Sequence, residues 1–196
     1  ATARLGQTTS SDDAEGTTLE SRSATSISAD DVRAAAVRFV GEIEQRPPAV
    51  SAIKVEGKRA YARARAGEDV VLASRHVTVT RFEVLDVRPD GDVLDIDLAV
   101  TCSSGTYIRA LARDLGERLG VGGHLTALRR TRVGAFDLTS AKTLADLEES
   151  FTLTPLDHVA AQAFVRRDLD EEQAATLSHG GKLTASGLGE QPVAAF

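Results

Sequence analysis

The chain of 196 residues has one cysteine, no methionine, no tryptophan and no long apolar run. Because Cys102 is alone, an internal disulfide is excluded, and the composition fits a reducing, cytoplasmic compartment. No stretch approaches the roughly 18 consecutive apolar residues that a membrane-spanning helix needs. The single cysteine and the four histidines do not follow the spacing of metal ligands. We therefore expect a globular protein without a disulfide, a membrane span or a metal site.

The missing methionine also bears on how the chain begins. No initiator residue precedes Ala1, and the segments 1–6 and 191–196 both resemble strands that are cut short. We therefore expect an internal fragment of a longer protein. A processed or engineered start is the alternative interpretation.

Negative charge predominates, with a formal net charge of -6 at pH 7, which taken alone argues mildly against a nucleic-acid partner. The basic residues, however, are concentrated in residues 54–65 and 129–132. The acidic residues are concentrated in residues 12–15 and in the last third of the chain. Such segregation permits a basic face on an acidic protein, so nucleic acid remains a candidate partner.

Hydrophobic periodicity predicts an α+β fold with a mixed or antiparallel sheet and flanking helices. Strands are expected at residues 1–7, 49–55, 77–87, 93–101 and 124–132, and helices at 28–46, 58–66 and 106–119. Ser28 and Asp31 resemble a capping box at the start of the first helix. The turn at residues 89–92 joins two alternating strands into a hairpin. Hairpins and helices that do not alternate as βαβ units favour this fold class.

The last part of the chain is expected to form a second, smaller domain. Thr154 and Pro155 suggest a boundary, which gives domains of residues 1–153 and 154–196. Just before it, residues 138–150 read as the end of a strand and a helix with Leu144 and Leu147 facing inward. Residues 163–196 read as a strand, a helix and a strand.

Tyr107 and Arg109 form the strongest candidate site. They follow the turn at residues 103–105, where a Ser- and Gly-rich loop enters an amphipathic helix. A flat phenol ring and a planar cation suit the binding of a base or an anion. The alternative is structural: Tyr107 would be a half-buried helix residue, and Arg109 would pair with Asp114 or Glu117.

The segment 124–132 contains a second set of candidates. As a strand it would place Thr126, Leu128, Arg130 and Arg132 on one face and Arg129 on the other. A leucine beside arginines can form the floor of a pocket with a phosphate-binding rim. The alternative is a core strand whose arginines are solvated, and His124 is more often structural than catalytic in such a place.

A third set combines positive charge with an aromatic ring. Lys54, Lys58, Arg59 and Arg63 accompany Tyr61, as on surfaces that follow a nucleic-acid backbone. A solvated helix face is the alternative interpretation. The sequence contains no Walker loop, dinucleotide-binding glycine pattern or zinc motif.

Four blocks of the sequence occur in the same order in one known family. They are residues 4–16, 47–65, 102–109 and 123–130. Together they resemble the bacterial tRNA pseudouridine-55 synthases of the TruB type. The resemblance covers residues 1–150 well, and the tail resembles the start of the small RNA-binding, PUA-like C-terminal domain of actinobacterial members. It implies the pseudouridine synthase fold.

The resemblance implies that uridine-55 in the T-loop of tRNA is flipped out and isomerised to pseudouridine by an Asp nucleophile, without cofactor or metal. By family position, Tyr107 would pack against the flipped uracil, and Arg109 would hold the nucleophilic carboxylate ionised. Leu128 would contact the base, and Lys54 would lie near the site. The basic residues would meet the RNA backbone of the T-stem-loop, and a monomer is expected. These basic residues are Lys58, Arg59, Arg63, Arg129 and Arg130.

The sequence departs from the family pattern at one decisive point. The family places its nucleophile in a Gly-x-Leu-Asp-Pro segment, and this chain contains no Asp-Pro. Asp13 lies in a family motif but receives no role. We therefore expect the parent protein to be the enzyme and this chain alone to be inactive. Two alternatives are a non-catalytic RNA-binding or tRNA chaperone module, and a small-molecule or protein-interaction domain with incidental basic patches.

Overall fold

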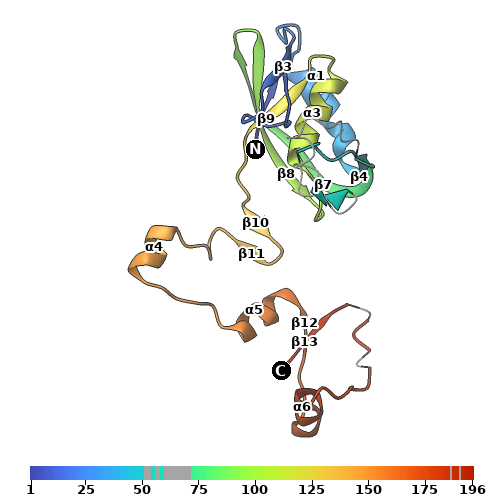
Figure 1. Cartoon of the computed structure of the whole chain (residues 1–196), viewed down its shortest axis with the longest axis vertical. Helices are drawn as coiled ribbons and strands as arrows, with labels where there is room; N and C mark the ends of the chain where they lie inside the picture. The colour runs from blue at the N-terminus through green and yellow to red at the C-terminus, as the bar shows by residue number, and fades with distance from the viewer. Residues whose placement is uncertain (51–53, 56–57, 60–71, 186, 190) are drawn as a thin grey trace. The chain divides into compact units, whose positions relative to one another are not determined.

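The computed structural model describes residues 1–50, 54–55, 58–59, 72–185, 187–189 and 191–196. Their contacts form two compact units, Ala1–Arg129 and Arg130–Phe196. The first unit contains a five-stranded sheet with the strand order β4-β7-β8-β1-β9 (Figure 1). Every neighbouring pair in this sheet is antiparallel, which confirms the predicted α+β fold. The strands are β1 (Thr2–Leu5), β4 (Gly41–Gln45), β7 (Arg75–Asp90), β8 (Val93–Cys102) and β9 (Gly123–Ala127).

Strands β7 and β8 form the hairpin that the alternating pattern predicts. They pair as far as Asp90 opposite Val93, and Gly91 turns the chain with a φ of 61°. One face of β8 is buried and the other carries acidic side chains, as a sheet with one covered face requires. The buried residues are Leu94, Ile96 and Leu98.

Helices α1 (Ala29–Ala36) and α3 (Ile108–Arg118) contribute their apolar sides to the same core as the sheet. Helix α1 begins with the predicted capping box, in which the Asp31 amide donates to Ser28 Oγ at 3.2 Å and the Ser28 amide donates to the Asp31 carboxylate at 2.9 Å. Burial of this apolar surface is the main force that holds the unit together. The largest fully buried apolar side chains are Leu5, Val32, Val79, Ile96, Leu111, Leu115 and Leu125.

Glycines allow α3 to lie directly against β9. A Cβ atom on Gly116 would overlap the backbone of Gly122, and one on Gly123 would approach the helix carbonyl of Ala112. The Gly122 amide also donates to the Gly116 carbonyl at 3.0 Å. The helix that carries the candidate site is therefore fixed on the sheet by a close backbone contact.

The helix predicted for residues 28–46 is wrong beyond Phe39. Helix α1 ends at Ala36, a 3-10 turn η1 covers Val37–Phe39, and strand β4 follows. Val40 already has an extended backbone, and Gly41 has a φ of 111°, a value that L residues with side chains rarely adopt, so the helix does not continue. Ile43 fits a helical period and also alternates with Glu42 and Glu44, and pairing with β7 selects the strand.

Two smaller hairpins also lie among the described residues of the first unit. Strands β2 (Gln7–Thr9) and β3 (Thr18–Ser21) pair with each other. The turn predicted at residues 8–16 is therefore wrong at Thr8 and Thr9, which belong to β2. Strands β5 (Lys54–Val55) and β6 (Lys58–Arg59) pair with each other. The helix predicted from Lys58 is therefore wrong at residues 58–59, and its remainder at 60–66 lies outside the described residues. Of the strand predicted at residues 49–55, β5 is present and residues 51–53 lie outside the described residues.

The second unit contains the predicted strand, helix and strand. Strands β12 (Val165–Arg167) and β13 (Val193–Ala195) are parallel, with Val165 opposite Val193, and α6 (Glu171–Ser178) lies between them in sequence. The expectation that Leu144 faces inward is wrong, because its side chain is 80% exposed on a short helix that begins at a Thr143 capping box. The boundary at residue 154 stays a prediction. The elements are β10 (Arg132–Val133), β11 (Phe136–Asp137), α4 (Leu144–Glu149), α5 (Leu156–Ala163), β12 (Val165–Arg167), α6 (Glu171–Ser178) and β13 (Val193–Ala195).

Candidate functional site

The loop before α3 is tied to the sheet. The Ser103 amide donates to the Thr78 carbonyl at 2.8 Å, and the Thr78 amide donates to Ser103 Oγ at 3.0 Å. Within the loop, Thr106 Oγ1 donates to the Ser103 carbonyl at 2.9 Å, and Gly105 adopts a φ of 82°. Because β7 anchors the loop, the first turn of α3 starts from a fixed point at Tyr107, its N-cap residue.

A buried glutamine fixes the backbone of Tyr107. Gln45, at the end of β4, is fully buried, and its carboxamide donates to the Tyr107 carbonyl at 3.0 Å. The same carboxamide accepts from the Tyr107 amide at 2.8 Å. Sequence reasoning missed Gln45, because nothing in a single sequence links residues 62 positions apart. The pair satisfies both backbone groups of Tyr107 and leaves its half-buried ring to the site.

Arg109 lies between two separate segments of chain. Its Nη1 donates to the Ser11 carbonyl at 3.2 Å, and its Nη2 donates to the Val50 carbonyl at 3.2 Å. Its Nε lies 3.7 Å from Asp13 Oδ2, and the Arg109 side chain is 26% exposed. The guanidinium is thus held in place mainly by neutral carbonyls, with a long contact to one carboxylate.

Asp114 and Glu117, the alternative partners considered for Arg109, lie beside Arg113 instead. Arg113 Nη2 lies 2.7 Å from Asp114 Oδ1, and its Nε lies 3.9 Å from Glu117 Oε1. Arg113 Nη1 also pairs with Asp12 Oδ2 at 2.9 Å, and its Nη2 donates to the Arg46 carbonyl at 2.8 Å. Sequence reasoning missed Arg113 and Asp12.

Three acidic side chains, those of Asp12, Asp114 and Glu117, lie around the single positive charge of Arg113. Its side chain is 11% exposed, and the Asp12 side chain is 15% exposed. Burial raises the pKa of Asp12, and the charge of Arg113 opposes this rise. The same causes act in the same order on Asp114, whose pKa is also raised. The charge of Arg113 therefore limits the rise in the pKa of both carboxyl groups.

The arrangement predicted for residues 124–132 is wrong beyond β9. The strand ends at Ala127, so Leu128, Arg130 and Arg132 do not share the face of one strand. Leu128 is 53% exposed, and Arg129 is exposed too. His124 is buried, with its Nδ1 3.2 Å from the Gln7 carbonyl, which fits the structural interpretation. A contact between Leu128 and a base stays a prediction.

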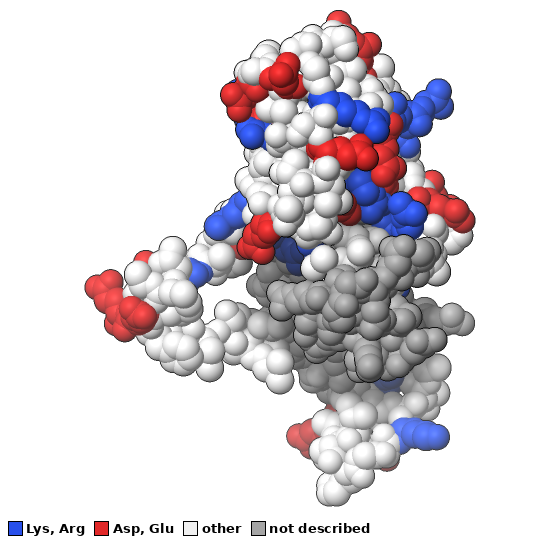
Figure 2. All heavy atoms as spheres, turned by 45° about the horizontal axis from the view of Figure 1, so that its top comes forward, with Lys and Arg blue, Asp and Glu red and all other residues white. Residues whose placement is uncertain are grey.

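The basic candidates of the second block are placed only in part. Lys54 lies opposite Arg59 in the β5–β6 pair, and Val55 lies opposite Lys58. Arg63 lies outside the described residues. In Figure 2, basic and acidic side chains lie next to one another on the described surface. The backbone pairing brings Lys54, Lys58 and Arg59 into one short hairpin, and their contact with RNA stays a prediction.

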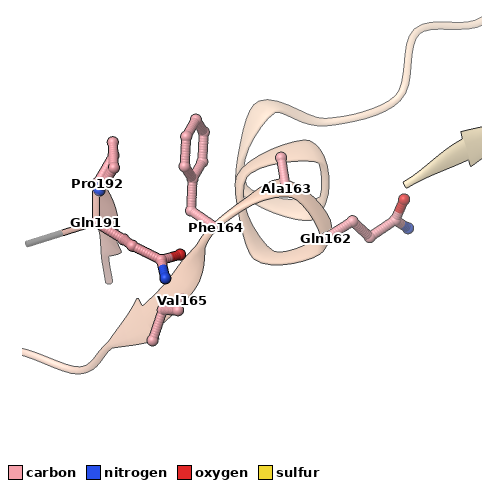
Figure 3. A pocket seen from close by; sticks show the side chains of 6 residues that line it. All are labelled: Gln162, Ala163, Phe164, Val165, Gln191 and Pro192. Atoms are coloured by element: carbon pink, nitrogen blue, oxygen red, sulfur yellow. The ribbon is translucent and has the colours of Figure 1, made fainter. Parts of the chain in front are cut away.

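A shallow hollow of about 420 Å³ lies within the second unit, between the end of α5 and strands β12 and β13. Figure 3 shows Phe164 and Val165 pointing to opposite sides of the chain. No candidate site residue lines this hollow. Among the described residues no group of three or more metal-ligating side chains comes together, and no helix is long and apolar enough to cross a membrane. The hollow's lining residues are Gln162, Ala163, Phe164, Val165, Gln191 and Pro192.

Two family models together match most of the chain. The model described as TruB family pseudouridylate synthase (N terminal domain) matches residues 1–108. The model described as tRNA pseudouridylate synthase B C-terminal domain matches residues 109–173. Tyr107 lies at the end of the first match and Arg109 at the start of the second.

Curated relatives are similar over nearly the whole chain. A protein of Arthrobacter sp. (strain FB24) named tRNA pseudouridine synthase B is 52% identical over 100% of this chain and 64% of its own length. A protein of the same name from Thermobifida fusca is 54% identical over 95% of this chain and 65% of its own length. The chain thus spans somewhat less than two thirds of these relatives.

Solved structures agree on the fold. The structure titled "Crystal Structure of a Cbf5-Nop10-Gar1 Complex" contains a chain with a TM-score of 0.60 and 24% identity, over 93% of this chain and 49% of that one. A second, "Structure of H/ACA RNP bound to a substrate RNA containing 2'-deoxyuridine", has a TM-score of 0.58 and 22% identity, over 93% of this chain and 47% of that one. With the family models, these likenesses confirm the predicted pseudouridine synthase fold.

Proposed function

Because the chain belongs to the TruB family of pseudouridylate synthases, we propose that the protein isomerises uridine-55 in the T-loop of tRNA to pseudouridine. Relatives named tRNA pseudouridine synthase B support this reading. In the reaction the N1–C1′ bond breaks and a C5–C1′ bond forms, while C5 loses a proton and N1 gains one. The balance requires no redox partner. No Asp-Pro pair occurs in the 196 residues, so the proposal assigns the nucleophilic carboxylate to none of them.

The observation that carries the proposal is the set of contacts that the Arg109 guanidinium makes. Its guanidinium is oriented by the carbonyls of Ser11 and Val50, and its contact to Asp13 is 3.7 Å long. An arginine held in this way can accept a further carboxylate with little rearrangement. A nearby cation lowers the pKa of a carboxyl group, so Arg109 would keep the nucleophile ionised and oriented.

Tyr107 supplies the aromatic surface for the flipped base. Gln45 fixes its backbone where α3 begins, so the ring starts from a rigid position. A flipped uracil loses stacking in the T-loop, and packing against an aromatic ring offsets part of this cost. In this proposal Leu128 contacts the base from the end of β9.

In this proposal basic residues of the segments 54–65 and 129–132 contact the tRNA backbone. In this proposal Lys54 lies near the uridine pocket. The backbone pairing of β5 with β6, which places Lys54 opposite Arg59 and Val55 opposite Lys58, supports grouping these cations. The protein acts as a monomer in the cytoplasm. The proposed phosphate contacts are Lys58, Arg59, Arg63, Arg129 and Arg130.

A second candidate function is a non-catalytic tRNA-binding or chaperone module. The observation that favours it is the lack of an Asp-Pro pair in the chain. It expects salt-sensitive binding of a T-stem-loop without turnover. Turnover therefore distinguishes the two candidates.

The experiment measures tritium release from a T-stem-loop labelled at C5 of uridine, with the full-length protein. We expect Arg109→Ala to lower kcat by about 100-fold or more, because a preorganised charge is lost. Arg118→Ala is the matched control, since Arg118 is an exposed arginine in the last turn of the same helix. Normal turnover by Arg109→Ala would contradict the role of Arg109, and binding without release by the wild type would favour the second candidate.

A further inference from the structure

Two arginines one helical turn apart hold the same two segments of chain. Arg109 and Arg113 are four residues apart on α3, so their side chains lie on one face of the helix. Both contact the loop between β2 and β3: Arg109 through the carbonyl of Ser11, and Arg113 through the carboxylate of Asp12. Both also bond to carbonyls in residues 46–50, just after β4.

Asp12 fixes the loop from both sides. Its carboxylate lies 2.9 Å from Arg113 Nη1, and its carbonyl accepts from the Leu125 amide of β9 at 3.0 Å. Asp12 has a φ of 57°, a left-handed value for which Asp and Asn are the best-suited residues with side chains. The next residue is Asp13, whose carboxylate contacts Arg109. The position of Asp12 thus sets the surroundings of the Arg109 guanidinium.

The hydrogen bonds of Arg113 are suited to holding other groups in position. Its guanidinium is used in several directions at once, toward Asp12, Asp114 and the Arg46 carbonyl. Burying such a charge costs about as much as its ion pairs return, so apolar residues of the same size would give similar stability. The distinctive property of a guanidinium is its rigid, directional set of donors, which a lysine cannot reproduce.

We propose that Arg113 is a positioning residue for catalysis, which acts through Asp12 and the Arg46 carbonyl to place Arg109 and the two segments around it. This inference rests on the proposed function. The clamp fixes the loop that carries Asp13 and the start of the segment that leads to Lys54. Displacing a reacting group by about 1 Å can cost roughly 100-fold in rate, so such a clamp affects turnover from outside the pocket.

The test compares Arg113→Lys, Asp12→Asn and the double variant in the full-length protein. Arg113→Lys keeps the charge and removes the donor geometry, whereas Asp12→Asn keeps a residue that tolerates the left-handed backbone and removes the charge. We expect each variant to lower kcat by about tenfold or more, while the Kd for the T-stem-loop changes by less than about twofold. The double variant should be little worse than the worse single one, because both break one unit. Arg118→Lys should match the wild type.

A second measurement separates positioning from general loss of stability. The Leu125 amide donates to Asp12, so its hydrogen exchange reports on the loop directly. We expect both variants to speed exchange at Leu125 while the amides of the central strand β8 remain protected. Equal acceleration throughout the unit would mean a merely structural role and would overturn the inference.

The outcomes also separate the inference from the function on which it rests. A wild-type protein that binds the T-stem-loop without turnover would refute the proposed function, and with it the role of Arg113 in that reaction. An active wild type with unchanged kcat in both variants would refute the role of Arg113 alone. A lower kcat, with protected β8 amides and faster exchange of the Leu125 amide, would support both the proposed function and the role of Arg113.

Discussion

The carboxamide of Gln45 forms two hydrogen bonds with the backbone of Tyr107. It donates to the carbonyl and accepts from the amide of the same residue, as a neighbouring strand would. The side chain is fully buried, so both of its polar groups need these partners. The first residue of the candidate site is thereby positioned by a residue at the end of strand β4.

We expect Gln45→Leu to lower the free energy of unfolding by about 2 kcal/mol, because the Tyr107 amide would lose its bond to Gln45 and the Tyr107 carbonyl would keep only its bond from the Leu111 amide. Urea denaturation followed by circular dichroism measures this change. Glu42→Leu on the same strand is the control, since Glu42 is exposed and the change there should stay within about 0.5 kcal/mol. Equal effects of the two substitutions would contradict the assigned role of Gln45.

At the residue scale, the sequence was sufficient for local features and insufficient for distant partners. Tyr107 and Arg109 were placed correctly at the start of a helix, because a Ser/Gly loop and an apolar stripe are local signals. The partners of Arg113 include Asp12, 101 positions away, and no pattern in a single sequence records such a contact. The catalytic roles of Tyr107 and Arg109 stay predictions.

At the scale of elements, long alternating segments were predictable and short ones were decided by pairing. The β7–β8 hairpin shows many residues of clear alternation and a turn at Gly91. Residues 41–45 are few enough to fit a helix or a strand, and the partner strand β7 selects between them. The same reasoning explains why β9 ends at Ala127, although the apolar pattern continues to Leu128.

The outer face of the sheet carries a ladder of ion pairs across β1, β7 and β8. Arg4 lies 2.8 Å from Asp95, and Arg88 lies 2.5 Å from Asp97. Hydrogen bonds from Arg88 and Thr2 lower the pKa of Asp97 to about 2, from an ordinary value of 3.8. A hydrogen bond from Arg4 likewise lowers the pKa of Asp95. Opposite charges on neighbouring strands therefore stabilise this face.

These lowered pKa values predict how stability depends on pH. A carboxylate whose pKa is lower in the folded state stabilises the fold above its unfolded pKa of 3.8 and loses this contribution as the pH falls through about 2. We expect the free energy of unfolding to decrease over this range, and Asp97→Asn to reduce the slope. Urea denaturation at a series of pH values tests this, because urea does not screen charges.

Glu15→Gln is the matched control for the acid series, since Glu15 is an exposed acidic residue of the same unit. It should leave the slope between pH 3.8 and about 2 nearly unchanged. An Asp97→Asn variant with the wild-type slope would show that the Arg88 pair does not contribute. High salt should weaken the wild-type slope as well, because these pairs are partly exposed.

Over the whole molecule, the net charge of -6 works against binding a polyanion. Several arginines of the first unit are paired with acids, among them Arg4, Arg81 and Arg88. The proposed affinity for tRNA therefore depends on local groups of cations rather than on the overall charge. This follows from the segregation seen in the sequence, in which residues 54–65 and 129–132 are rich in basic side chains.

We therefore expect the affinity for a T-stem-loop to fall steeply with salt, and the joint change Arg129→Gln and Arg130→Gln to reduce the slope. Each phosphate contact contributes about 0.7 to 0.9 to the slope of log affinity against log salt, so the loss should be about 1.5. Fluorescence anisotropy at several salt concentrations measures it. Arg81→Gln is the control, because Arg81 already pairs with Glu83. An unchanged slope in the double variant would exclude Arg129 and Arg130 from the RNA contact and leave the cations of residues 54–65 to carry it.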